Sequence, residues 1–214
     1  MLLERTFHTL CRIENERLQL PIFYESPIAL RFEIGDPEIP VFLHEIQQNP
    51  LYFRSALWRA SFLYEKTAPF DTLLWVLYRS PDTKTEIDEL LSRFCRLTLT
   101  PPPAEVYQQE TTDADGEPLT RIFFFWDLTQ TPLKPGPLLD GILASELGGF
   151  RELSSAVFLF DTKRHILFHP YDDRGLDIVA EKKEILLPLY RDCRNWLLDY
   201  DWERMQKIFE GICD

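Results

Sequence analysis

The sequence lacks any apolar run long enough to span a bilayer. A membrane-spanning helix needs about 20 consecutive apolar residues, whereas apolar runs here, such as 122–126 and 156–160, have the length of strands. The N-terminus also lacks the apolar stretch of a secretory signal, because acidic and polar residues follow at once after Leu3. We therefore expect a cytoplasmic protein with no membrane association.

Cysteine is scarce and scattered. The four cysteines, Cys11, Cys95, Cys193 and Cys213, include no Cys-x-x-Cys pair, so the ligand spacing of a zinc knuckle is missing. A chain of this length does not need disulfides to build a stable core. We expect free thiols and no cofactor.

Basic residues are few: 23 lysines and arginines stand against 35 acids, for a net charge of −12. A general nucleic-acid-binding protein normally has the opposite sign, so that class is set aside. Acidity keeps a protein soluble and also favours a basic partner where one exists. A basic protein is therefore the partner that the composition favours, although most acidic proteins have none.

Hydrophobic residues make up 45% of the chain and aromatic residues 14%, which is enough for a sizeable core. The length of 214 residues suits one domain spanning 1–214. The run of prolines at 101–103 is the best candidate for an internal joint. No Gly-x-Gly-x-x-Gly or P-loop motif is present to bind a phosphate.

The first half of the chain mixes helices and strands. Alternating apolar and polar residues over 28–34 predict a strand that ends at Gly35. Asn49 and Pro50 are residue types that cap and begin a helix. The apolar stripe of that helix is expected to consist of Phe53, Leu57, Ala60 and Tyr64. The expected elements are a helix within 1–26, a strand at 28–34, a helix at 50–65, a strand at 71–78 and a helix at 83–96.

The second half contains two hairpins followed by helices. The first hairpin pairs 105–111 with 120–127, with its tip at 113–118 and a strand core at 122–126 that is apolar on both sides and should be covered on both faces. The remaining elements are a helix at 137–148, a hairpin of 156–160 with 165–169, a helix with Pro188 in its first turn and a last helix capped by Asp199 or Asp201. The pattern predicts an α+β fold with a mostly antiparallel central sheet built from hairpins, flanked by helices that include two C-terminal ones.

One segment concentrates polar groups of catalytic type: His165, His169, Tyr171, Asp172, Asp173, Arg174 and Asp177. In a strand, His165 and His169 would point to the same face. With Asp172 and Asp173 they form a candidate divalent metal site.

A structural interpretation explains the same segment without a metal. Asp172-Asp173-Arg174-Gly175 has the composition of a tight turn, with Gly175 in a left-handed conformation. On this interpretation, which we favour, Arg174 is at least half buried and pairs with a carboxylate. Nucleophilic catalysis has less support, because Ser154 and Ser155 lie in no Gly-x-Ser-x-Gly motif.

The chain resembles a bacterial family of domains of unknown function, DUF3885. The resemblance is carried by Tyr171–Asp177, Leu189-Tyr190, Asn195–Asp201, Arg31–Gly35, Tyr52-Phe53, Arg59-Ala60 and Phe70-Asp71, and spans about Leu30 to Phe209. Because the family has no established activity, the resemblance implies a bacterial origin and little about mechanism.

Two functions follow as hypotheses. The first is a protein-binding module without catalytic activity, for instance an immunity protein that neutralises a toxin, with acidic patches at 113–117 and 199–203 facing a basic partner. The alternative is a metal-dependent hydrolase that uses His165, His169, Asp172 and Asp173, in which the ion activates a water molecule.

Overall fold

The computed structural model describes residues 2–14, 20–79, 84–112 and 116–210. Within these residues, seven strands form one sheet in the order β1-β7-β6-β5-β2-β4-β3, and every neighbouring pair is antiparallel. The strands are β1 (Ala29–Glu33), β2 (Thr72–Arg79), β3 (Glu105–Thr112), β4 (Pro118–Asp127), β5 (Val157–Asp161), β6 (Ile166–Pro170) and β7 (Gly175–Ala180). The predicted α+β fold with an antiparallel sheet is confirmed.

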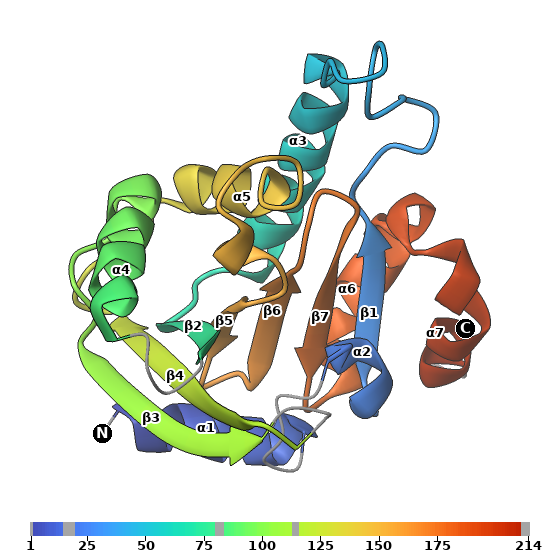
Figure 1. Cartoon of the computed structure of the whole chain (residues 1–214). Coiled ribbons are helices and arrows are strands. Elements are labelled where there is room, and N and C mark those ends of the chain that lie inside the picture. Colours follow the sequence, from blue (N-terminus) through green and yellow to red (C-terminus); the bar gives the residue numbers. More distant parts are fainter. Residues whose placement is uncertain (1, 15–19, 80–83, 113–115, 211–214) are drawn as a thin grey trace.

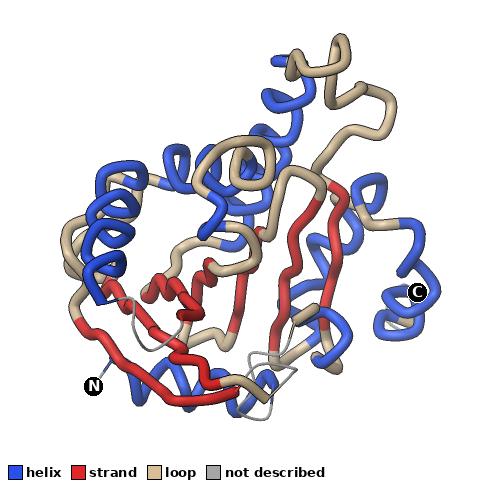
Figure 2. Tube along the Cα trace, viewed as in Figure 1, coloured by secondary structure: helices blue, strands red, loops and turns tan. Residues whose placement is uncertain are grey.

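Helices cover both faces of this sheet (Figures 1 and 2). They are α1 (Leu2–Glu14), α2 (Ile22–Glu25), α3 (Pro50–Thr67), α4 (Lys84–Thr98), α5 (Pro135–Leu143), α6 (Lys183–Asp192) and α7 (Trp202–Phe209), with short 3-10 turns at Arg151–Leu153, Arg194–Trp196 and Asp199–Asp201. Helix α2 lies in front of β7 and β1 in Figure 1, whereas α6 lies behind them. None of the described helices has the length and apolar character needed to cross a bilayer.

Strand β4 is the aromatic centre of one half of the sheet. On one face, Phe123 and Phe125 contact Phe7 of α1, with ring centroids 5.7 and 6.1 Å apart. On the other face, Phe124 stacks on Trp75 of β2 at 5.1 Å, and Phe94 of α4 stacks on Trp75 and on Trp126 of β4. The prediction that this strand is covered on both faces is confirmed. Residues 113–115 of the predicted hairpin tip lie outside the described residues, and Gly116 has the expected positive φ of 85°.

Helix α3 begins as predicted but presents a different stripe to the core. The Asn49 side chain accepts a hydrogen bond from the backbone N–H of Leu51, and Pro50 is the first helical residue. The residues buried on this helix are Tyr52, Ala56, Ala60, Leu63 and Thr67. The predicted stripe is therefore wrong by about one position, because the Tyr52 hydroxyl has a buried partner in the loop before β7.

Helix α5 ends at Leu143, five residues before the predicted end at Gly148. The Ser145 hydroxyl donates to the carbonyl of Ile142 at 2.6 Å, and this local bond competes with continuation of the helix. Turns then lead to Gly148, which has a φ of 94°.

Helix α6 begins at Lys183, so Pro188 lies inside the helix and not in its first turn. The first turn of the helix comes before the proline because Leu186 is fully buried and belongs to the apolar face that covers the sheet. Packing of that face outweighs the backbone hydrogen bond that Pro188 cannot make.

The outer edge of β1 is partly covered by the segment that follows α6. Phe32 forms an isolated antiparallel bridge with Leu197, and the backbone N–H of Leu198 donates to the carbonyl of Arg31 at 2.9 Å. This contact holds the 195–201 segment beside Arg31. Cys95 and Cys193 are free thiols, as predicted; the Cys11 side chain and Cys213 lie outside the described residues.

Replacing Phe124 with Ala should lower the free energy of unfolding by about 3–5 kcal/mol, because a fully buried ring stacked on Trp75 is removed. Val106 is the control, since it lies opposite Phe124 in the ladder but is 51% exposed. Urea unfolding of the two alanine variants checks this. A Phe124→Ala protein as stable as Val106→Ala would contradict the assignment of β4 to the core.

Candidate functional site

Three polar side chains lie in one row across the sheet. Asp177 of β7 is opposite His169 of β6 on one side and opposite Arg31 of β1 on the other. Residues that face each other across antiparallel strands project to the same face, so the three side chains are neighbours. Next to His169 in this row, Phe158 of β5 stacks on the imidazole ring at a centroid distance of 4.3 Å.

The central contact of the row is a buried ion pair. Arg31 Nε donates to Asp177 Oδ1 at 2.8 Å, and a terminal nitrogen of Arg31 donates to Oδ2 at 2.9 Å. Arg31 is 8% exposed and Asp177 is 1% exposed. Burial alone would lower the pKa of the guanidinium, but its hydrogen bonds to Asp177 hold that pKa above its ordinary value. Arg31 is therefore a permanent cation in the core.

A second carboxylate and two aromatic rings enclose the same guanidinium. Asp201 lies 3.5 Å from the remaining terminal nitrogen of Arg31. The rings of Phe23 and Tyr24 in α2 each lie 4.8 Å from the guanidinium carbon. The Tyr24 hydroxyl donates to Asp201 at 2.9 Å. Asp201 stands at the N-cap of α7 as predicted, but its side chain makes no capping bond there and faces Arg31 and Tyr24 instead.

The predicted turn, 172–175, follows the end of β6 and lies next to this row. Asp172 accepts hydrogen bonds from the backbone N–H of Arg174 and from its Nε, both at 2.8 Å. The Tyr52 hydroxyl donates to Asp173 at 2.9 Å, which ties the turn to α3. Gly175 is an extended strand residue, so the expected left-handed conformation is wrong. A Cβ there would lie 2.1 Å from the Tyr171 hydroxyl, and close approach is the reason for glycine.

The prediction that Arg174 is at least half buried is wrong. Its side chain is 69% exposed, and it pairs with Asp172 and with Glu146 at the surface. Pairing with a carboxylate was predicted correctly. The Asp172 carboxylate is buried, whereas the pair with Glu146 is exposed on both sides and contributes at most about 1 kcal/mol. Arg31, not Arg174, is the buried arginine of this region. Asp177, the one charged residue of the otherwise apolar strand β7, was the signal in the sequence.

The four candidate metal ligands do not come together. Strand β6 begins at Ile166, so the alternation that placed His165 beside His169 does not extend to His165, which has a φ of 55°. His165 lies 3.6 Å from Glu181, whereas His169 is buried against Phe158. Within the described ranges of the chain, no three His, Cys, Asp or Glu side chains form a cluster able to hold a metal ion.

A small cavity of about 190 Å³ opens beside the row. It is lined by Leu20, Pro21, Arg31, Ser155, His169, Tyr171 and Asp177. Ser155 has a φ of 53° and enters this group because its backbone N–H donates to the carbonyl of Tyr171 at 2.9 Å. Its place in the cavity could not be seen from its surroundings in the sequence.

The two titratable rings of this cavity are neutral near pH 7. Burial lowers the pKa of the His169 imidazole to about 4. Burial, with Asp177 nearby, raises the pKa of the Tyr171 hydroxyl. His169 Nδ1 lies 2.9 Å from the carbonyl of Val157, which can only accept, so Nδ1 carries the proton and Nε2 keeps a lone pair.

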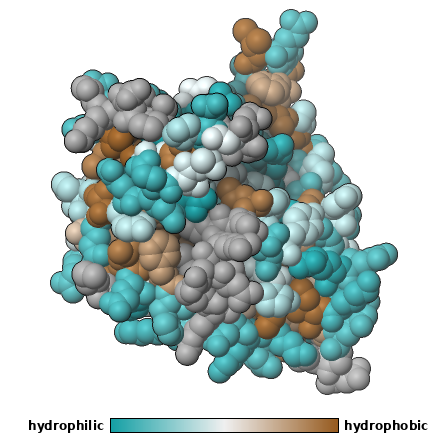
Figure 3. All heavy atoms as spheres, turned by 60° about the horizontal axis from the view of Figure 1, so that its bottom comes forward, coloured by the Kyte–Doolittle hydropathy of each residue, from teal (hydrophilic) through white to brown (hydrophobic). Residues whose placement is uncertain are grey.

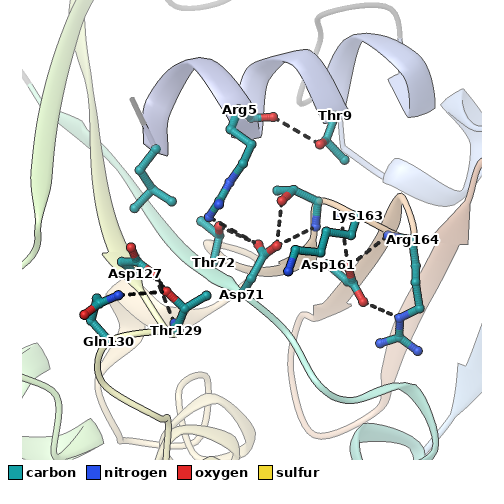
Figure 4. A network of polar contacts seen from close by, with 12 residues as sticks. Arg5, Thr9, Asp71, Thr72, Asp127, Thr129, Gln130, Asp161, Lys163 and Arg164 are labelled. Atoms are coloured by element: carbon teal, nitrogen blue, oxygen red, sulfur yellow. Dashed lines mark hydrogen bonds and ion pairs between the residues drawn. The ribbon is translucent and has the colours of Figure 1, made fainter.

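A separate polar network surrounds Asp71 at the opposite end of the sheet (Figure 4). Asp71 accepts from the Thr162 hydroxyl at 2.6 Å and from the Thr72 hydroxyl at 2.9 Å, and Arg5 of α1 reaches it at 3.8 Å. These contacts tie β2 and the β5–β6 turn to α1. An open cavity of about 490 Å³ lies along α1 here. Three of its polar residues already have partners, since Thr9 bonds the carbonyl of Arg5, Thr162 bonds Asp71 and Asp127 bonds Thr129, so we place the candidate site at the Arg31 row.

The fold and this site define an α+β domain in which a buried arginine joins an antiparallel sheet to the C-terminal segment. The chain belongs to the family described as Domain of unknown function (DUF3885), whose model matches residues 6–201. No curated protein and no solved structure matches the chain. The match begins within α1, so it includes residues 6–27, which lie before the span of the resemblance, and it ends at Asp201, before α7.

The buried His169 should make folding stability depend on pH. The unfolded chain takes up a proton on this residue below about pH 6.5, whereas the folded protein takes it up only near pH 4. The contribution of His169 to stability is therefore complete above pH 6.5 and declines as the pH falls toward 4, by up to about 3 kcal/mol.

Urea unfolding at pH 7, 6, 5 and 4.5 measures this effect. The parent should lose stability more steeply than His169→Phe, which keeps a ring on Phe158 but has no titrating group. His44→Phe, a change at an exposed histidine, should follow the parent. Parallel losses in the parent and His169→Phe would show that this imidazole does not resist protonation.

Proposed function

We propose that this chain is a non-catalytic protein-binding module of the bacterial cytoplasm, which captures a basic protein through one projecting segment. That segment, called the arm here, comprises residues 37–51. It belongs to the connection between β1 and α3 and includes the first two residues of α3. It stands away from the sheet at the top of Figure 1 and forms a narrow projection with apolar atoms near its end in Figure 3.

The observation that carries the proposal is the apolar surface of the arm. Four large hydrophobic side chains are exposed on it: Phe42 (41%), Leu43 (48%), Ile46 (90%) and Leu51 (60%). Apolar side chains that gather on a projection, outside the core, are typical of surfaces that a partner covers.

The arm is ordered by its own hydrogen bonds. The backbone N–H of Leu43 donates to Gln47 and that of Asn49 donates to Val41, both at 2.8 Å, and Phe42 bridges to Gln48. The Asn49 side chain donates to the carbonyl of Pro40 at 2.9 Å while it caps α3. A preformed segment loses little conformational entropy on binding, so its apolar contacts contribute more fully to affinity.

Charge favours a basic partner. The chain has a net charge of −12, and Glu38 and Glu45 are exposed on the arm itself. In the acidic patch predicted at 199–203, Asp199 and Glu203 are exposed, whereas Asp201 is buried against Arg31. A basic toxin neutralised by this chain is one partner with the required chemistry. An acidic surface around an apolar contact accelerates encounter with such a protein.

The test begins with the partner in the cell. A photo-crosslinking residue placed at Ile46 should trap a basic protein, and the same residue at Val106, an exposed apolar position on β3, should not. Trapping of a second copy of this chain, or equal trapping from both positions, would contradict the proposal.

The trapped protein, once purified, allows a quantitative test. Ile46→Ser should weaken its binding by about tenfold or more, because an apolar contact at the centre of the interface is lost. Val106→Ser should bind like the parent, and both variants should melt like the parent. Association should slow as salt rises. Unchanged affinity in Ile46→Ser would place the contact surface elsewhere.

A further inference from the structure

The cavity beside the Arg31 row contains polar groups that the fold itself does not use. Its volume of about 190 Å³ has room for roughly six water molecules at about 30 Å³ each. His169 lines it while being 1% exposed. A buried polar group normally has a hydrogen-bond partner, so an unpaired one beside a cavity indicates a ligand.

Buried His169 and partly buried Tyr171 both line the cavity. Nδ1 of His169 is occupied by the carbonyl of Val157, which leaves Nε2 as an acceptor. The Tyr171 hydroxyl is close to Gly175 but forms no hydrogen bond with any described residue. Nε2 likewise has no partner among those residues. A ligand that offers N–H donors satisfies both atoms.

The charges around the cavity decide against an anion. Arg31 could attract one, but two of its nitrogens already bind Asp177 and a third lies near Asp201. Arg31 therefore has no free nitrogen to offer an anion, and the Asp177 carboxylate in the cavity wall would repel one. The remaining wall, formed by Leu20 and Pro21, is apolar.

We propose that this cavity binds a small organic ammonium ion. Its N–H groups donate to His169 Nε2 and to the Tyr171 hydroxyl oxygen, and its short alkyl part lies against Leu20 and Pro21. The Asp177 carboxylate in the cavity wall attracts its positive charge. None of the residues that line this cavity belongs to the arm. The proposal of ammonium binding therefore does not depend on the proposal of protein binding.

The first experiment uses n-propylammonium as the probe and propionate as a probe of similar size and opposite charge. Titration of each to 100 mM into the labelled protein, followed by NMR, should shift the resonances of His169 and Tyr171 with the ammonium ion only. Equal shifts with propionate, or no saturable shift with the ammonium ion, would overturn the proposal.

Two tyrosine variants then separate binding from structure. Tyr171→Phe should weaken n-propylammonium binding about three- to tenfold, the equivalent of one hydrogen bond. It should not lower the melting temperature, because that hydroxyl forms no hydrogen bond with the residues that the structure describes. Tyr52→Phe removes a hydroxyl that donates to Asp173, so it should lower the melting temperature and leave binding unchanged.

His169→Phe should also abolish the shifts, since it keeps the stacked ring and removes Nε2. If this variant fails to fold, Tyr171→Phe decides alone. A Tyr171→Phe protein that binds the probe like the parent but melts lower would show that the hydroxyl is structural, and the proposal would be wrong.

Discussion

The ion pair between Arg31 and Asp177 is the contact on which this half of the molecule depends. Burying two charges in a sheet is unfavourable unless each is fully paired. The pair meets this condition through a two-bond contact, with Asp201 and the rings of α2 around the guanidinium. Arg31 lies in β1, and its partners lie in β7, in α2 and in the residues before α7. Pairing this one cation therefore holds four segments of the chain in a single arrangement.

The same constraint explains the neighbouring segment. Asp172 and Asp173 serve the turn and its contact with α3, which leaves them committed to structure. His169 is fixed by Val157 and Phe158. In the described part of the chain, an imidazole nitrogen of His169 and the Tyr171 hydroxyl have no hydrogen-bond partner, and both residues line a small cavity. The paired side chains of the Arg31 row thus fix the structure, and His169 and Tyr171 are left to bind a ligand. The exposed apolar arm is separate from both.

Much of the fold was predictable from the sequence because it rests on local patterns. Apolar continuity identified β4, alternation identified β1, and Asn49-Pro50 marked the start of α3. The errors arose where tertiary contacts outweigh local preference. Pro188 lies inside α6, and Asp201 binds Tyr24 and not its own helix. Arg174 was expected to be the buried arginine because its turn is conspicuous, but which arginine is buried depends on strand order, and single-sequence periodicity contains no information on pairing between distant strands.

A double-mutant cycle on Arg31 and Asp177 tests the central claim most directly. Urea unfolding at pH 7 would compare Arg31→Met, Asp177→Leu and the double variant with the parent. We expect each single change to cost about 3–5 kcal/mol, because it leaves a buried charge unpaired, and the double change to cost far less than their sum. The exposed pair of Arg174 and Glu146 gives the reference for a weak interaction. Single changes that each cost under about 1 kcal/mol and add in the double variant would contradict this account.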